Sequence, residues 1–269
     1  LAAAGLSVAA LALTACGGSA SSVASSVASS ASSAAASTSA AAGELTTVEA
    51  GKLTMATNAA FPPYEMTTDA GDFEGIDIET AQAIADKLGL ELQIDDMDFD
   101  AALLSVQQGK ADIVMAGVTV TDERKAVMDF SDSYATGIQS IIVPEGSDIA
   151  SPDDLAGKKI GTQRGTTGYI YCSDDFGDEN VVAYDDGLTA VQALNNGQVD
   201  AVVIDNAPAQ EFIAANPGLK ILDTSYAEED YAIGMAKNSP LEDAVNSVLE
   251  ELKADGTLQA IVDKYITAE

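Results

Sequence analysis

The chain is short of the residues on which most enzyme and metal chemistry depends. Its 269 residues include no histidine, no tryptophan and only two cysteines, Cys16 and Cys172. The absence of histidine removes the commonest general base and the commonest transition-metal ligand. Two cysteines cannot form a cysteine-rich metal site, and an aromatic content of 5% argues weakly against a surface that stacks on carbohydrate. We therefore expect no metal site and no cofactor.

Positive charge is the second shortage. Lysine and arginine total 12 against 43 aspartates and glutamates, which gives a formal net charge of -31. Such a surface repels nucleic acid and anionic lipid headgroups, so we expect neither as a direct partner. The chain contains only two arginines, Arg124 and Arg164. Because arginine offers a rigid two-pronged donor for carboxylate or phosphate, the positions of these two residues are informative.

The first sixteen residues have the composition of a secretory signal. Residues 1–15 are apolar and small, but they are fewer than the roughly 20 apolar residues that cross a bilayer. The segment lacks an initiator methionine and a basic start, so we expect preceding residues to be missing. Residues 13–18, LTACGG, resemble the lipobox of bacterial lipoproteins. The resemblance implies that Cys16 becomes the lipidated first residue of the mature protein; the alternative is an accidental cysteine after an apolar run.

Residues 19–42 are almost entirely serine and alanine. Such a segment cannot bury enough apolar surface to offset the entropy lost on ordering. We expect residues 17–50 to form a flexible tether between a lipidated Cys16 and a globular part. With Cys16 lipidated, Cys172 has no disulfide partner. The arrangement predicts a protein attached to the outer face of a cell membrane.

Residues 111–124, ADIVMAGVTVTDER, run from a buried-strand pattern through a glycine and threonines to the start of a helix. That order places backbone N–H groups, the hydroxyls of Thr119 and Thr121, and the guanidinium of Arg124 at one strand end. Such a ledge suits an anionic group, either a carboxylate or a phosphate.

Two segments of the globular part show the same order of strands and helices. In the first segment we predict strands at 52–57, 90–94 and 112–116, a loop at 59–64, and helices beginning at Asp77 and Asp100. In the second segment we predict strands at 158–162, 181–184 and 199–204, a short helix at 169–171 and a helix over 188–194. Alternation of this kind predicts parallel sheets covered by helices. We expect two similar α/β lobes, with one long doubly wound sheet as the alternative.

The linking segments indicate how the lobes are joined. Apolar strands are predicted at 138–144 and 231–236, and helices follow Ser239–Pro240 and Gly256. We expect lobe 1 to contain residues 51–138 and 231–269, and lobe 2 to contain residues 139–230. Two strands that cross between lobes make a hinge. The predicted fold is therefore a two-lobe α/β fold of mostly parallel sheets flanked by helices.

Six motifs resemble, in order, those of the bacterial family-3 extracellular solute-binding proteins, which include glutamine-binding and lysine/arginine/ornithine-binding proteins. The motifs are TNAAFPPYE (57–65), GIDIE (75–79), MDFD (97–100), AGVTVTDER (116–124), DFS (129–131) and GTQRGTTG (161–168). The resemblance covers about residues 52 to 266. It implies a type II periplasmic-binding-protein fold and a monomer that captures a free L-amino acid and delivers it to an ABC permease.

The resemblance also implies a set of ligand-binding residues. In such a site Arg124 would bind the α-carboxylate with help from Thr119 and Thr167. The carbonyl of Gly117 and the carboxylate of Asp205 would hold the α-ammonium. The remaining expected binding residues are Phe61 and Phe99, which would sandwich the aliphatic part, Asn58 and Gln163, which would face the side chain, and Val118 and Thr166.

The positions of Arg124 and Asp205 support this implication independently. A free amino acid carries one carboxylate and one ammonium on a single carbon. Arg124 follows one predicted strand end and Asp205 ends the corresponding strand of the other segment. Ligands of parallel α/β sheets bind at such ends. The plainer alternatives are that Arg124 pairs with Asp122 or Glu123 at the surface and that Asp205 caps a helix.

The side-chain end of the site departs from the pattern of some relatives. Several have an aspartate where this chain has Asn58, and some glutamine binders have a lysine at the position of Gln163. A neutral amide at residue 58 argues against lysine or arginine as the preferred ligand. We expect a polar, neutral amino acid, although these two positions do not identify it.

Two other functions compete with transport. Some proteins of this fold are dehydratases of cyclic, prephenate-like acids, of the cyclohexadienyl or arogenate type. That chemistry needs a positioned acid or base, for which the motifs offer only Asp205 and Glu65, so we expect no enzyme. A ligand-sensing module would be followed by a membrane or signalling segment, whereas this sequence stops at Glu269.

Overall fold

The computed structural model describes residues 45–266. The predicted signal segment, Cys16 and most of the predicted tether lie outside these residues. The last part of the predicted tether, residues 45–50, contacts the folded part. Leu45 packs against the core, and the Val48 N–H donates to Asp112 Oδ1 at 2.7 Å. Within the described part of the chain, no helix is both long and apolar enough to cross a membrane.

One lobe is built on a five-stranded sheet. Its elements are β1 (Lys52–Thr57), α1 (Ile76–Leu88), β5 (Glu91–Asp96), α2 (Phe99–Gln107), β6 (Ile113–Val114), α3 (Asp122–Val127), β7 (Met128–Phe130), β14 (Gly234–Ala236), α7 (Glu242–Ala254) and α8 (Thr257–Tyr265). The strand order is β5-β1-β6-β14-β7. β1 is parallel to β5 and β6, and β14 is antiparallel to β6 and β7. Every residue of β1 after Lys52 is buried, as expected for a strand covered on both faces.

The other lobe is built on a second sheet. Its elements are β8 (Ala135–Pro144), η1 (Pro152–Leu155), β9 (Ile160–Gln163), α4 (Thr167–Phe176), η2 (Asp178–Asn180), β10 (Val181–Tyr184), α5 (Gly187–Asn195), β11 (Ala201–Asp205), α6 (Asn206–Ala215), β12 (Leu219–Ile221) and β13 (Ala227–Tyr231). The order is β10-β9-β11-β8-β12, with β13 also paired to β8. β9 is parallel to β10 and β11, and β8 is antiparallel to its neighbours.

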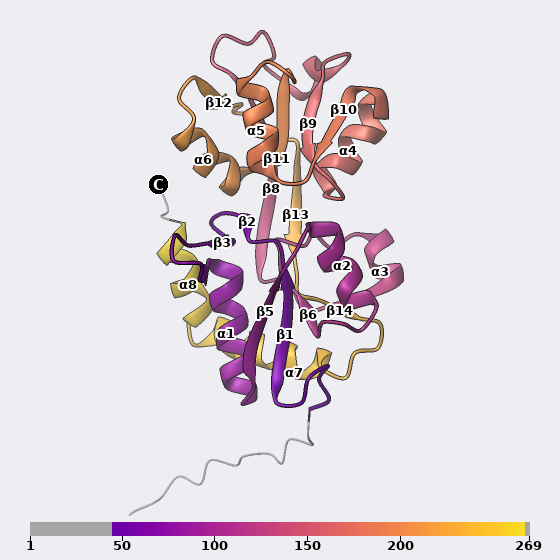
Figure 1. Ribbon diagram of the computed structural model, residues 1–269, viewed down its shortest axis with the longest axis vertical. Coiled ribbons are helices and arrows are strands. Elements are labelled where there is room, and N and C mark those ends of the chain that lie inside the picture. The colour runs from indigo at the N-terminus through magenta and orange to yellow at the C-terminus, as the bar shows by residue number, and fades with distance from the viewer. Residues whose placement is uncertain (1–44, 267–269) are drawn as a thin grey trace, which may run out of the picture. The chain divides into compact units, whose positions relative to one another are not determined.

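β8 and β13 join the two lobes (Figure 1). They pair antiparallel, with Ala227 opposite Gln139 and Tyr231 opposite Ala135. The chain leaves the first lobe along β8 and returns to it after β13. The expected α/β fold of two lobes joined by two strands is therefore confirmed, and the alternative of one long sheet is wrong because there are two separate main sheets. The prediction of mostly parallel sheets is wrong, because β14 in one sheet and β8 in the other pair antiparallel with their neighbours.

The largest apolar cluster continues from one lobe into the other at this junction. It includes the buried rings of Tyr64, Tyr134 and Tyr231. The rings of Tyr64 and Tyr231 meet edge to face with centroids 5.3 Å apart, a favourable geometry for aromatic pairs. The hinge strands are thus packed against the core as well as hydrogen-bonded to each other.

The predicted loop at 59–64 contains a strand. Ala60–Phe61 forms β2, which pairs with β3 (Glu65–Thr67), and β3 pairs in turn with β4 (Phe73–Glu74). The two prolines that argued against a strand occupy the turn between β2 and β3, where no ladder hydrogen bond is lost. This small sheet places Glu65 in a buried position.

The predicted starts of the first two helices are wrong by one or two residues. α1 begins at Ile76 after Gly75, and Asp77 points inward instead of capping the helix. Asp77 is fully buried and accepts hydrogen bonds from the Gly117 N–H at 3.0 Å and the Tyr134 hydroxyl at 2.7 Å. α2 begins directly after Asp98, so Asp100 lies in its first turn. An aspartate near a helix start fits either role, and only tertiary contacts decide between them.

Three later boundaries also differ. The short helix predicted at 169–171 is longer in the structure, where it is α4. α4 begins directly after Thr166, whose hydroxyl caps the helix by accepting the Tyr169 N–H. The apolar segment 231–236 is divided between β13 and β14, which belong to different sheets. α7 begins at Glu242, and the Ser239 hydroxyl accepts the Leu241 N–H in the turn before it.

Candidate functional site

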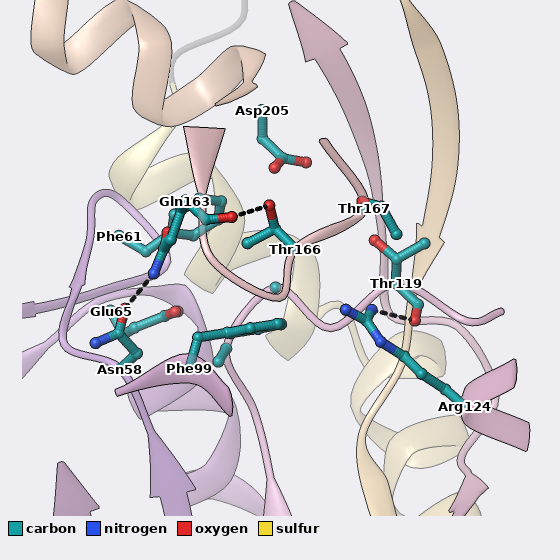
Figure 2. A pocket seen from close by; sticks show the side chains of 12 residues that line it. Asn58, Phe61, Glu65, Phe99, Thr119, Arg124, Gln163, Thr166, Thr167 and Asp205 are labelled. Atoms are coloured by element: carbon teal, nitrogen blue, oxygen red, sulfur yellow. Dashed lines mark hydrogen bonds between the residues drawn. The ribbon is translucent and has the colours of Figure 1, made fainter. Parts of the chain in front are cut away.

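A cavity between the two lobes collects the predicted binding residues (Figure 2). Its lining consists of Asn58, Phe61, Glu65, Phe99, Ala116, Gly117, Thr119, Arg124, Gln163, Thr166, Thr167 and Asp205. All the predicted binding residues of the described chain line it except Val118. The Val118 side chain is fully buried in the core, and its carbonyl accepts the Ala232 N–H at 3.1 Å. Val118 thus connects the strand-end ledge to the hinge.

Arg124 is held in the cavity wall by its own helix. The Thr121 hydroxyl caps α3 by accepting the Arg124 N–H at 3.2 Å. Arg124 is 8% exposed, and its guanidinium donates to the Thr119 carbonyl at 2.8 Å and to the Gly165 carbonyl of the other lobe at 3.1 Å. It also lies over the Phe99 ring, 5.4 Å from the centroid. The alternative of a surface arginine paired with neighbouring acids is wrong.

The Arg124 charge has no ionic partner among the described residues. Burial lowers its pKa, and the nearby carboxylate of Glu229 acts in the opposite direction. Arginine stays protonated under all ordinary conditions. The wall therefore presents a buried positive charge that a small anion could neutralise.

Glu229 connects the two lobes, and the sequence analysis missed it. The hydroxyls of Thr119 and Thr167, one from each lobe, donate to its Oε2 at 3.1 and 3.0 Å, and Gln139 Nε2 donates to the same atom at 3.0 Å. Oε1 has no partner in the described structure. The alternation of β13 could have indicated this residue, because Glu229 shares a strand face with the fully buried Tyr231.

Asp205 lies at the end of β11 and is 7% exposed. Its Oδ2 accepts Gln139 Nε2–H at 2.9 Å, and its Oδ1 accepts the Tyr231 hydroxyl. Burial raises the pKa of Asp205 to about 7, although the Tyr231 hydrogen bond acts against this rise. Asp205 occupies the N-cap position of α6, as the capping interpretation expected, but its side chain makes no capping hydrogen bond. A ligand ammonium at this carboxylate would restore its ordinary ionisation.

Amide and carboxyl groups form the end of the cavity away from Arg124. Figure 2 shows Asn58, Glu65 and Gln163 on one side and Arg124 on the other, with Phe99 between them. Gln163 Nε2 donates to Asn58 Oδ1 across the lobes at 2.8 Å, and Asn58 Nδ2 donates to the Met97 carbonyl at 3.0 Å. From sequence, Glu65 was considered only as an acid for the enzyme alternative.

Gly117 allows the aromatic wall to approach the backbone. Its φ is +54°, and a Cβ there would lie 2.8 Å from Cε1 of Phe61. Phe61 and Phe99 are both buried and both line the cavity, so they are not simply core residues remote from the site. The two rings and the bare glycine backbone bound the middle of the cavity, between Arg124 and the amide end.

Two residues considered from the sequence lie away from the cavity. Arg164 is exposed and pairs with Asp185 at 3.5 Å. Cys172 is fully buried, and burial raises the pKa of its thiol to about 12, which leaves it protonated. Among the described residues, no group of three or more His, Cys, Asp or Glu side chains could hold a metal ion.

Little free space remains in the cavity. The space open to the centre of a water molecule is about 10 Å³, roughly enough for one water. Two hydrogen bonds cross it directly, from Gln163 to Asn58 and from Arg124 to Gly165. A ligand the size of an amino acid could enter only if the lobes separate about the β8–β13 junction.

The chain belongs to the bacterial extracellular solute-binding proteins of family 3, whose family model matches residues 53–268. It is 33% identical over 226 residues to the L-cystine-binding protein TcyJ of Escherichia coli K12, covering 82% of this chain and 85% of TcyJ. It is 32% identical to a probable histidine-binding protein of Neisseria gonorrhoeae, covering 99% and 95%. These relatives are solute-binding proteins, not enzymes, and the enzyme alternative is set aside.

Solved structures agree on the fold, which is that of the type II periplasmic binding proteins. The arginine-, lysine-, histidine-binding protein ArtJ from Geobacillus stearothermophilus superposes with a TM-score of 0.78 at 34% identity, covering 81% of this chain and 96% of ArtJ. An ancestral arginine-binding protein bound to glutamine gives a TM-score of 0.77 at 41% identity, covering 81% and 99%. The ancestral protein bound to arginine gives 0.76 at 42% identity, covering 80% and 98%.

Proposed function

We propose that the protein is the extracytoplasmic substrate-binding subunit of an amino-acid ABC transporter. In this proposal it binds a free L-amino acid between its lobes, closes about the β8–β13 hinge and delivers the ligand to the transmembrane permease. The observation that carries the proposal is the placement of one buried guanidinium, Arg124, and one buried carboxylate, Asp205, in opposite lobes around one cavity. The amino-acid-binding names of the relatives support it.

The site residues take complementary roles in this proposal. Arg124 binds the α-carboxylate, assisted by Thr119 and Thr167. Asp205 and the Gly117 carbonyl hold the α-ammonium. An acid opposite the guanidinium disfavours a ligand with phosphate alone and suits a zwitterion. The remaining contacts come from Phe61 and Phe99 on the aliphatic part, from Asn58 and Gln163 on the side chain, and from Thr166 and the Val118 backbone.

We further propose a polar ligand with a neutral side chain. The two amides at the far end of the cavity, Asn58 and Gln163, offer both donors and acceptors without net charge. Several relatives bear names for cationic amino acids, so the preference is a property to be measured. We expect the protein to act as a monomer on the outer face of the cell membrane, anchored through lipidated Cys16.

A panel of the twenty L-amino acids tests the function. Binding to the folded state alone raises the melting temperature by mass action, so thermal shift identifies the ligands and calorimetry gives their affinities. We expect a response to one or a few polar amino acids at a stoichiometry of about one. A lack of response to all twenty would contradict the proposal.

A further inference from the structure

Glu65 is a buried acid in the wall of the cavity that no role proposed above uses. It begins β3, lies beside Asn58 at the side-chain end and is fully buried. Neither of its side-chain oxygens accepts a hydrogen bond from an N–H or hydroxyl donor of the described residues. A buried polar group without a donor is costly, which calls for an explanation of its presence.

The side chain that meets Glu65 is another carboxyl, Asp77 of α1. Two carboxyl groups can hydrogen-bond only when one of them carries a proton. Asp77 receives the Gly117 N–H and the Tyr134 hydroxyl, two donors that stabilise its ionised form. Glu65 receives none of these, so the proton resides on Glu65. Burial raises the pKa of Glu65 well above its ordinary value and that of Asp77 to about 6.

The other groups that face Glu65 also favour its protonated form. The charges that act on it come from Asp77 on α1, Asp96 at the end of β5 and Asp205 at the end of β11, and all are acidic. The Tyr134 hydroxyl is directed to Asp77 and stays neutral, because burial raises its pKa. Near neutral pH Glu65 is therefore a neutral carboxylic acid that can donate one hydrogen bond.

We infer that Glu65 sets the charge of the ligand side chain that the cavity accepts. This inference rests on the proposed function, because it assumes a free amino acid with its α-groups on Arg124 and Asp205. As a carboxylic acid, Glu65 accommodates a neutral polar side chain such as an amide. A cationic side chain binds beside the Glu65 carboxylate, which forms when the acid loses its proton to solvent.

Proton balance gives the inference a measurable signature. A neutral amide binds without changing the ionisation of Glu65, whereas a guanidinium or ammonium side chain displaces one proton. The affinity for a cation relative to a neutral amino acid therefore rises with pH while free Glu65 is protonated, by up to about tenfold per pH unit. The ratio removes the contribution of the α-groups, which both ligands share.

The experiment measures arginine and glutamine by titration calorimetry between about pH 6 and pH 8.5, in two buffers of different ionisation enthalpy. We expect arginine binding to release about one proton more than glutamine binding and the affinity ratio to rise with pH. In Glu65→Gln, which keeps the size of the side chain, arginine affinity should fall at least tenfold, glutamine affinity should change less than threefold, and the extra proton should disappear. The control, Glu74→Gln, changes an exposed acid of the same small sheet.

The outcomes separate this inference from the proposed function. If neither these ligands nor any other amino acid binds the wild-type protein, the proposed function fails and the inference fails with it. If amino acids bind but arginine binds at no pH in this range, or binds without extra proton release, the inference alone is overturned. Equal losses for both ligands in Glu65→Gln would also overturn it. The wild-type proton count decides the matter even if that variant does not fold.

Discussion

At Arg124, a positive charge is buried beside backbone carbonyls with no carboxylate in ion-pair distance among the described residues. Removing a charge from water is costly unless a partner compensates it. The two carbonyl acceptors and the Phe99 face compensate in part. Under the proposed function, a ligand carboxylate would complete the compensation.

Arg124→Ala should therefore weaken amino-acid binding by roughly 3–5 kcal/mol, because the ligand carboxylate would be buried without its charged partner. That loss is at least about a hundredfold in Kd. Calorimetry with the best ligand of the panel measures it. The matched control is Arg164→Ala, which removes the exposed arginine and should leave Kd unchanged. An unchanged Kd in Arg124→Ala would refute the assigned role.

Asp205 predicts a pH dependence for neutral ligands. Its pKa is raised to about 7, so the free protein holds a proton there at lower pH. That proton must leave before an ammonium binds, and affinity should therefore fall as pH drops below about 7, by up to about tenfold per unit. Calorimetry between about pH 5.5 and 8 measures this slope. Asp205→Asn should bind weakly with no slope, and a flat wild-type profile would contradict the prediction.

At the scale of elements, two threonine-capped helices, one in each lobe, place polar groups in the cavity wall. Thr121 caps α3 in one lobe and Thr166 caps α4 in the other. Each cap accepts the N–H three residues further on, which is the Arg124 N–H in α3 and the Tyr169 N–H in α4. The caps fix where the helices begin, and hence where Arg124 and Thr167 enter the cavity.

Loss of the α3 cap should cost stability and affinity together. Thr121→Ala removes the acceptor for the Arg124 N–H, which should lower the free energy of unfolding by about 1 kcal/mol and the melting temperature by about 2–4 °C. Urea unfolding measures the loss of stability, and calorimetry measures the loss of affinity. Thr121→Ser retains the hydroxyl and should behave like the wild type. If the alanine and serine variants proved equally stable, the cap would have no energetic role.

For the whole molecule, the stability of the closed arrangement depends on two opposing contributions. Contacts across the cavity favour closure, and the conformational freedom that the lobes gain on separating opposes it. The direct contacts from Gln163 to Asn58 and from Arg124 to Gly165 are few. The lobes are also joined by the Thr119–Glu229 hydrogen bond, by the β8–β13 pair and by the Tyr64–Tyr231 packing. Hinge closure with this small number of direct contacts is consistent with a site that opens to admit its ligand.

The excess of acidic residues predicts a salt effect on stability. A net charge of -31 makes the folded state repel itself, and salt screens that repulsion. The melting temperature at pH 7 should rise, by about a few degrees, between about 10 mM and 300 mM NaCl. At about pH 4.5, where many carboxylates are protonated, the rise should be smaller. A melting temperature that falls with salt at pH 7 would contradict this prediction.

The sequence by itself determined the features that depend on neighbouring residues. The two lobes follow from the alternation of apolar strands and helices, and the helix stops at Gly89 and Gly256 follow from their left-handed backbone. The ledge from Gly117 to Arg124 was predictable because a capping threonine and the residue it serves lie three positions apart. Such features are local, so a linear pattern specifies them.

Only the tertiary structure decided which acidic side chains are buried, and against what. Asp77 sits at a helix start and fits a cap, but it accepts bonds from distant residues instead. From sequence Glu65 was considered only as an acid for the enzyme alternative and Glu229 was missed, yet both are buried, Glu65 in the cavity wall and Glu229 against Thr119 and Thr167 of that wall. The cost of burying a carboxyl is set by the groups around it, which come from remote parts of the chain. For that reason the sequence indicated Arg124 and Asp205 as candidate binding residues, and only the fold placed Glu65 in the wall of the same cavity.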